Sequence, residues 1–219
     1  MFPLTDEPNT IVYLPEAFEE STPEALHALI RANPLGAVVI HTEDGLEANH
    51  LPFLLDVDEH GKAVLRGHVA RKNSFATLHP AGTDALVIFE GPSAYISPNW
   101  YPSKQVTHEV VPTYNYAVVH VHGRLRPIDD PRWVRGLVSR LTQRMEATQP
   151  VPWKMGDAPA DYLDQMIDKI VGIEIPVDRM IGKWKMSQNR TPEDRAGVVR
   201  GLSETGSSLN AEVASLVRR

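Results

Sequence analysis

The sequence predicts an α+β protein that is mainly β, in which short connections join the strands and helices lie at the periphery. Three observations favour this class. Four runs typical of strands, bounded by turn residues, occupy 36–42, 47–56, 63–69 and 84–89. A longer β-rich run spans 114–125, where we expect a strand that closes a barrel. Helical spacing of apolar residues appears in the stretches before and after these strands.

The composition is that of an ordinary soluble globular protein. The chain has 219 residues, 42% hydrophobic and 23% charged, and is long enough to bury a core without disulfides. We expect one domain over 1–219 with a C-terminal helical extension at about 191–219. The absence of cysteine excludes thiol catalysis, zinc–thiolate sites and iron–sulfur clusters. The formal net charge of −6 argues against a broad nucleic-acid-binding face.

The sequence also predicts a cytoplasmic protein with no membrane partner. Its first residues carry neither a basic region nor an apolar core of signal-peptide length. No later apolar run is long enough to span a bilayer.

The first helix is expected at 21–33, because Pro23 suits its first turn and Pro34 ends it. Turns at 43–45 and 58–61 then separate the first three strands. The resulting arrangement is a meander of sequential antiparallel strands.

The turn that follows the strand 63–69 is a candidate anion site. Arg71 and Lys72 stand where the strand gives way to a short helix, and Asn73 or Ser74 would cap that helix. Two cations beside free helix N–H groups can hold a phosphate from two sides. A solvated basic pair would produce the same pattern, so the turn alone leaves both interpretations open.

Residues 91–112 have no clear periodicity and are expected to form a long loop. The segment contains Tyr95, Trp100 and Tyr101. Long loops with aromatic side chains often border sites, although ordinary aromatic packing would also anchor such a loop.

A metal site is not expected. His120 and His122 lie two residues apart and would share one face of a strand. No carboxylate or third histidine follows at a suitable spacing, so half-buried or solvated histidines are favoured over a metal pair.

The C-terminal half alternates helices with one strand. A helix capped by Asp129 or Asp130 begins at Pro131, a third helix spans 162–170 and a strand spans 171–177. The arginines of the first of these helices, which could contact an acidic partner or face solvent, are Arg132, Arg135, Arg140 and Arg144.

The segment 183–190 is expected to form a strand with Lys183, Lys185 and Ser187 on one face, which would suit an anionic group or simply a solvated edge. A capping box at Thr191 then opens a helix through Leu202. The last helix is expected at 209–217. We interpret these two helices as packing elements rather than as a DNA-reading unit, because acidic residues dilute their arginines.

Several segments together resemble the PaiB-type FMN-binding negative transcriptional regulators. This family lies within the FMN-binding split-barrel superfamily, which also contains the pyridoxamine 5′-phosphate oxidases. The resemblance covers nearly the whole chain and implies an FMN-binding split β-barrel with peripheral helices. Its carriers are Asn49–Phe53, Gly67–Asn73, Ser97–Tyr101, Val111–Tyr116, Lys183–Arg190 and Thr191–Leu202.

The resemblance implies where FMN would bind. In the superfamily a pair such as Arg71 and Lys72 binds the phosphate, while backbone like that of 49–51 and 68–69 borders the isoalloxazine ring. The site is usually shared between two subunits, which implies a homodimer. The implied cofactor-binding residues are Asn49, His50, Leu51, His68, Val69, Arg71, Lys72, Asn115, Lys183, Lys185 and Gln188.

Two departures from the superfamily pattern are visible. Ser74 stands where relatives often carry proline, and a serine can still cap a helix. The C-terminal Trp and Arg arrangement of the pyridoxamine-phosphate oxidases is missing, which argues against that activity.

Three functions remain open. The first is a dimeric FMN-binding sensor that represses transcription, with direct DNA contact undecided. The second is an FMN-dependent oxidoreductase for a small substrate. Because no Gly-x-Gly-x-x-Gly fingerprint follows a strand, a nicotinamide nucleotide would bind to it only transiently. The third is a haem-binding split barrel that uses a histidine such as His68 or His122.

Overall fold

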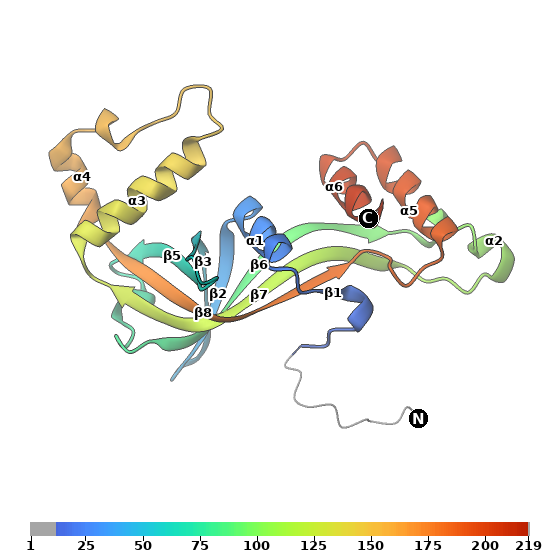
Figure 1. The fold of residues 1–219 in the computed structure, drawn as a ribbon, viewed down its shortest axis with the longest axis horizontal. Helices are drawn as coiled ribbons and strands as arrows, with labels where there is room; N and C mark the ends of the chain where they lie inside the picture. Colours follow the sequence, from blue (N-terminus) through green and yellow to red (C-terminus); the bar gives the residue numbers. More distant parts are fainter. Residues whose placement is uncertain (1–11, 219) are drawn as a thin grey trace. The chain divides into compact units, whose positions relative to one another are not determined.

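The structure is a computed structural model that describes residues 12–218 (Figure 1). The chain divides into two compact units. The first comprises 1–22, 91–118 and 181–219, and the second comprises 23–90 and 119–180. Three long strands, β6 (Thr83–Ile96), β7 (Thr113–Ile128) and β8 (Ile170–Lys185), run through both units.

The strands pair as one sheet in the order β3-β2-β6-β7-β8-β5-β4, with β1 beside β8. The pairings between described residues leave this sheet open. The remaining strands are β1 (Glu19–Glu20), β2 (Leu35–Thr42), β3 (Gly45–Pro52), β4 (Leu54–Val57) and β5 (Ala63–Ala70).

Six α-helices accompany the strands in the described residues, and none is long and apolar enough to cross a membrane. They are α1 (Pro23–Ala32), α2 (Lys104–Thr107), α3 (Pro131–Glu146), α4 (Ala160–Ile167), α5 (Pro192–Glu204) and α6 (Ser208–Arg218). Short 3₁₀ helices lie at Glu16–Phe18, Ser74–Thr77, Pro98–Trp100 and Met155–Asp157.

The core of the second unit follows from alternation along its strands. In β2 the buried residues are Gly36, Val38 and Ile40, which alternate with the partly exposed Ala37 and Val39. Fully buried Phe89 of β6 and Phe53 meet edge to face, with ring centroids 6.0 Å apart. The buried faces of β2 and β6 therefore contribute apolar side chains to the core of this unit.

A cluster of four charges joins α3 to the strands of the second unit. Asp56 accepts hydrogen bonds from Arg66 at 2.5 Å and from Arg140 at 2.8 Å, and Arg66 also donates to Glu174 at 2.9 Å. Burial would raise the pKa of Asp56, but the hydrogen bonds and charges of Arg140 and Arg66 outweigh it and lower that pKa.

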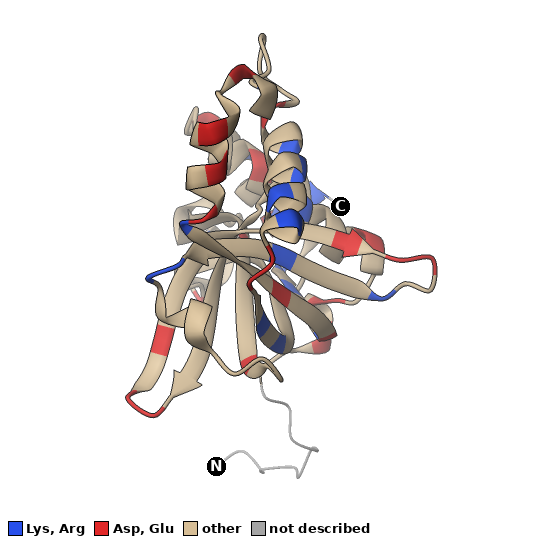
Figure 2. Ribbon diagram, turned by 90° about the vertical axis from the view of Figure 1, so that its left-hand side faces the viewer, with Lys and Arg blue, Asp and Glu red and all other residues tan. Residues whose placement is uncertain are grey.

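Two of the four predicted α3 arginines thus form ion pairs. Arg140 binds Asp56, while Arg135 binds Asp164 of α4. Arg144 donates instead to the backbone oxygen of Arg31 at 3.2 Å. Figure 2 shows basic residues along α3 and acidic residues on the neighbouring α4.

In the first unit, α5 holds the segment that follows β6. A Cβ at Gly197 or at Gly201 would overlap Trp100, in the first case its backbone oxygen and in the second its indole ring. Asp194, which is 3% exposed, accepts from the backbone N–H of Ser103 at 3.0 Å and from its hydroxyl at 2.7 Å. Small residues and one buried carboxylate therefore fix 97–103 against the helix.

Several expected boundaries differ from the structure. The expected strand 47–56 is interrupted at Phe53, whose N–H donates to the oxygen of Pro34. The expected loop 91–112 begins only after Ile96, because β6 continues through Tyr95. β7 lies between β6 and β8 rather than closing the sheet, so that expectation was wrong.

The expected strand face of Lys183, Lys185 and Ser187 is also wrong. β8 ends at Lys185, and Ser187 has a left-handed backbone with φ 64°. Thr191 caps α5 as expected, but Asp194 binds Ser103 and so gives no reciprocal half of a capping box. The caps expected at Asn73 and at Asp130 are confirmed.

We predict that Gly197→Ala destabilises the protein by about 1–3 kcal/mol, because the added methyl group overlaps the backbone of Trp100. Gly136→Ala in α3 is the matched control, since a Cβ there meets nothing within 4 Å. The control should be stabilised by roughly 0.5–1 kcal/mol through helix propensity alone. Urea unfolding measures both changes, and equal effects of the two substitutions would contradict the packing described for α5.

Candidate cofactor site

The predicted site residues fall into two groups, one in each unit. Seven belong to the second unit: Asn49, His50, Leu51, His68, Val69, Arg71 and Lys72. Four belong to the first unit: Asn115, Lys183, Lys185 and Gln188. Each group is described within its own unit.

In the second unit, the edge strand β3 is tied to the turn after β5. The amide of Asn73 donates to the side-chain oxygen of Asn49 at 2.7 Å, and Asn73 in turn accepts from the N–H of Phe75 at 2.9 Å. The hydroxyl of Ser74 donates to Glu47. β3 pairs with β2 and stands at the end of the strand order, so the backbone of Asn49–Leu51 lies on a sheet edge.

Arg71 is held by an acidic partner that the sequence did not reveal. Its guanidinium donates to both carboxylate oxygens of Asp129 at 2.7 and 2.8 Å and to the backbone oxygen of Asp168 at 2.7 Å. The hydrogen bonds with Arg71 lower the pKa of the Asp129 carboxyl. Lys72 is exposed and makes no side-chain hydrogen bond or ion pair with any residue in 12–218.

His68 and Val69 lie on β5, opposite Gly172 and Val171 of β8. Val69 is buried, whereas His68 is partly buried and its Nδ1 is buried without a hydrogen-bond partner among the described residues. Burial lowers the pKa of His68. On β3, His50 is exposed and Leu51 is buried, so Leu51 is a core residue that could offer only its backbone to a ligand.

In the first unit, two lysines bind neutral acceptors. Lys183 donates to the backbone oxygen of Tyr13 at 2.8 Å, and its ammonium lies over the rings of Tyr13 and Tyr116 at 5.4 and 5.8 Å. Lys185 donates to the hydroxyl of Thr113 and to the backbone oxygen of Tyr114. Burial, followed by the charges of Lys183 and Arg190, lowers the pKa of Lys185.

The other two residues of this group form local structure. Asn115 is 1% exposed and donates to the hydroxyl of Ser187 at 3.0 Å. Gln188 accepts from the N–H of Met186 at 2.6 Å and donates to the oxygen of Trp184 at 2.5 Å. Both side chains stabilise the turn between β8 and α5, and their amide groups are engaged in doing so.

The histidines of β7 form no metal cluster. No group of three or more His, Asp or Glu side chains in residues 12–218 is arranged to hold a metal ion. Nδ1 of His122 lies 3.4 Å from the guanidinium of Arg179, and burial followed by the charges of Arg179 and His120 lowers the pKa of His122.

The open antiparallel sheet, with an edge strand tied to a strand-to-helix turn, has the architecture of the flavin-binding split barrels. The FAD and heme binding protein of Mycobacterium smegmatis shares this fold, with a TM-score of 0.58 and 16% identity over 81% of this chain and 78% of that chain. The expected split-barrel class is thereby confirmed.

A family model described as "Putative FMN-binding domain" matches residues 12–179, and the chain belongs to this FMN-binding family. The family match assigns FMN as the cofactor. The chain is 29% identical to the protease synthase and sporulation protein PAI 2 of Bacillus subtilis, over 94% of this chain and 96% of the relative, which confirms the PaiB-type resemblance. It is 32% identical to an uncharacterized protein of Emericella nidulans over 94% and 96% of the two chains.

We predict that His68 contributes to acid sensitivity. The pKa of His68 is lower in the folded state than in the unfolded chain, so the unfolded chain is protonated at a higher pH than the folded protein. The free energy of unfolding therefore falls as the pH drops below about 6.5, the pKa of histidine in the unfolded chain. Urea unfolding at pH 7.5 and pH 5.5 should show a smaller loss in His68→Gln than in the parent. Exposed His60→Gln is the control, and an equal loss in both variants would contradict the prediction.

Proposed function

We propose that the protein is a homodimeric FMN-binding sensor of the PaiB type that acts as a negative regulator of transcription. Its membership of the FMN-binding family and its full-length similarity to PAI 2 of Bacillus subtilis support this function. Within the chain, the hydrogen bond between Asn49 and Asn73 carries the proposal, because it couples the edge strand to the turn bearing Arg71 and Lys72.

The ring and the phosphate of FMN would bind to different groups in this region. Backbone groups on the edge at Asn49–Leu51 suit the carbonyl and nitrogen atoms of an isoalloxazine ring. Lys72 and Arg71 would hold the phosphate. When bound, FMN would supply a centre that accepts one or two electrons, and the protein residues would bind and orient it.

The charge balance around Arg71 decides how well the phosphate fits. Asp129 already occupies the guanidinium in a bidentate pair, and Glu47 adds a second carboxylate beside Ser74. A phosphate that binds here must therefore replace Asp129 as the partner of Arg71 or share it. Both Arg71 and Asp129 are solvent-exposed, so water can stabilise Asp129 after such an exchange.

The lysines of the first unit are the second candidate for an anionic group of the cofactor. Lys185 has only neutral acceptors, and burial, followed by the charges of Lys183 and Arg190, disfavours its protonated form. An anion would relieve this repulsion between like charges. We therefore assign the phosphate first to Arg71 and Lys72 and treat Lys183 and Lys185 as the contribution of a second subunit.

We predict opposite effects of two substitutions in the Arg71 pair on FMN affinity. Arg71→Ala should weaken binding roughly ten- to hundredfold, because a charge-assisted phosphate contact is lost. Asp129→Asn should tighten binding, because it removes the competing carboxylate. Quenching of flavin fluorescence during titration measures both affinities.

Lys183→Ala is the comparison variant for this titration, and it should weaken binding less than Arg71→Ala. Circular dichroism would check that each variant is folded. An Arg71→Ala protein that binds FMN as tightly as the parent would remove the turn from the site.

We predict a dimer in solution, formed through exposed apolar side chains of the first unit. Tyr95 and Tyr114 are 49% and 58% exposed with ring centroids 5.9 Å apart, and Val106 and Val111 are 81% and 64% exposed. Light scattering at micromolar concentration should give a dimer for the parent and for the control Tyr162→Glu, but a larger monomer fraction for Tyr114→Glu. A monomeric parent would contradict a shared cofactor site.

An absorbance spectrum separates the three functions that the sequence left open. The purified protein with added FMN should show perturbed flavin bands, whereas a haem protein with added haemin would show a Soret band. Anaerobic addition of NADPH then distinguishes a sensor from an oxidoreductase. Slow or no bleaching of bound FMN supports the sensor, and rapid bleaching without another substrate would favour the enzyme.

A further inference from the structure

The helix α5 has two faces with different roles. The buried face carries Asp194, Gly197 and Gly201, which hold the segment around Trp100. Residues at helical spacing on the other side line a groove between α5 and α6. The groove has a volume of about 460 Å³, and its lining residues are Pro192, Arg195, Ala196, Val199, Arg200, Val217 and Arg218.

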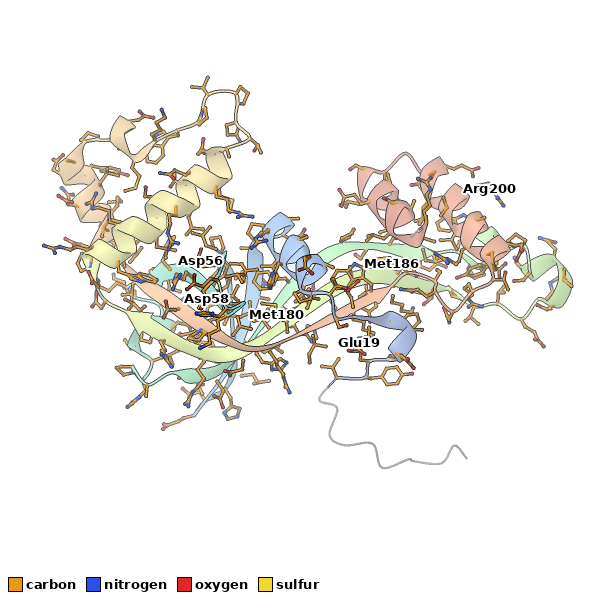
Figure 3. The ribbon with its side chains drawn as sticks, viewed as in Figure 1. Glu19, Asp56, Asp58, Met180, Met186 and Arg200 are labelled. Carbon is orange, nitrogen blue, oxygen red and sulfur yellow. The ribbon has the colours of Figure 1, made fainter. Side chains whose placement is uncertain are left out.

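The groove is positively charged, and no residue of its lining carries a negative charge. Three of the lining residues are arginines and none is acidic. In the part of the chain that the structure describes, the side chains of Arg200 and Arg218 have no hydrogen-bond or ion-pair partner. Figure 3 labels Arg200 on α5.

Arg195 adds a third positive charge at a partly buried position. It donates to the backbone oxygen of Val217, a neutral acceptor, and its Nε is buried without a hydrogen-bond partner among residues 12–218. Asp194, its neighbour in sequence, is already bound to Ser103 on the other face of the helix. A partly desolvated guanidinium without a carboxylate partner interacts strongly with an incoming anion.

The rest of the lining is apolar. Ala196 and Val199 of α5 and Val217 of α6 contribute methyl groups, and Pro192 adds its ring. The volume lies in the range of small-molecule sites, which combine an apolar lining with a few charged groups. The four candidate FMN residues of this unit are not part of the lining. They are Asn115, Lys183, Lys185 and Gln188.

We propose that the groove between α5 and α6 binds an amphipathic organic anion, namely a carboxylate or phosphate monoester carried on an apolar or aromatic body. Arg200 and Arg218 would bind the anionic group, since guanidinium groups match these oxygens in bidentate geometry. Val199 and Val217 would contact the apolar body. The proposal does not depend on FMN binding, so either can fail without the other.

The test uses 8-anilinonaphthalene-1-sulfonate, an aromatic anion whose fluorescence rises in apolar surroundings. The full chain should bind it saturably, and Arg200→Gln/Arg218→Gln should bind it at least about tenfold more weakly. The matched control is Arg31→Gln/Arg126→Gln, which removes the same charge at exposed positions outside the groove and should bind like the parent.

Competition identifies the chemistry of the ligand. Displacement by 1-naphthoate or by 1-naphthyl phosphate supports the proposal, and the stronger competitor defines the anionic group. N-phenyl-1-naphthylamine has a similar aromatic body without the charge and should compete poorly. Inorganic phosphate, which lacks the body, should also compete poorly, and equal competition by either of these two compounds would overturn the proposal.

Methyl NMR of the parent locates the probe without depending on how the variant folds. The methyl signals of Val199 and Val217 should shift on titration, while those of Val38, in the core of the second unit, should not. Unchanged signals for Val199 and Val217, or undiminished binding by a folded Arg200→Gln/Arg218→Gln protein, would overturn the site.

Discussion

The antiparallel pairing of β5 with β8 is the constraint on which the second unit depends. Residues 64–70 pair in register with residues 170–176, so segments about a hundred positions apart in sequence lie side by side. The N–H of Arg71 continues the ladder by donating to the oxygen of Lys169 at 2.8 Å. Backbone hydrogen bonds alone therefore fix the position of the candidate phosphate turn relative to β8.

Sequence periodicity could predict the strands and helices because each is a local pattern. Alternation in β2, the prolines in the first turns of α1, α3 and α5, and the cap residues of α3 and α5 are each contained in one short segment. The end of β8 could not be predicted, because residues 183–187 alternate like a strand. In the structure Ser187 instead lies in a turn, where its hydroxyl pairs with the buried amide of Asn115. Tertiary contacts overrode the local pattern at that point.

The candidate site could be predicted only in part. The Arg71–Lys72 turn was identified from its two cations at the start of a helix, and Asn49 from a segment that resembles a known family. The structure brings Asn49 into contact with Asn73 of that turn. The sequence could not show that Asp129 is the partner of Arg71. The two residues are 58 positions apart, and an aspartate just before Pro131 is typical of a helix cap. In fact the neighbouring Asp130 is the cap, which leaves Asp129 free to bind the arginine.

The left-handed backbone of Ser187 shows how one position balances two opposing costs. A non-glycine residue in this conformation costs about 1 kcal/mol, and glycine would remove that strain. Glycine would also remove the hydroxyl that is the hydrogen-bond partner of the buried amide of Asn115, and an unpaired buried polar group costs about 1–3 kcal/mol. Serine is therefore favoured where backbone geometry alone would select glycine, and a relative that carries glycine here would be expected to replace Asn115 with an apolar residue.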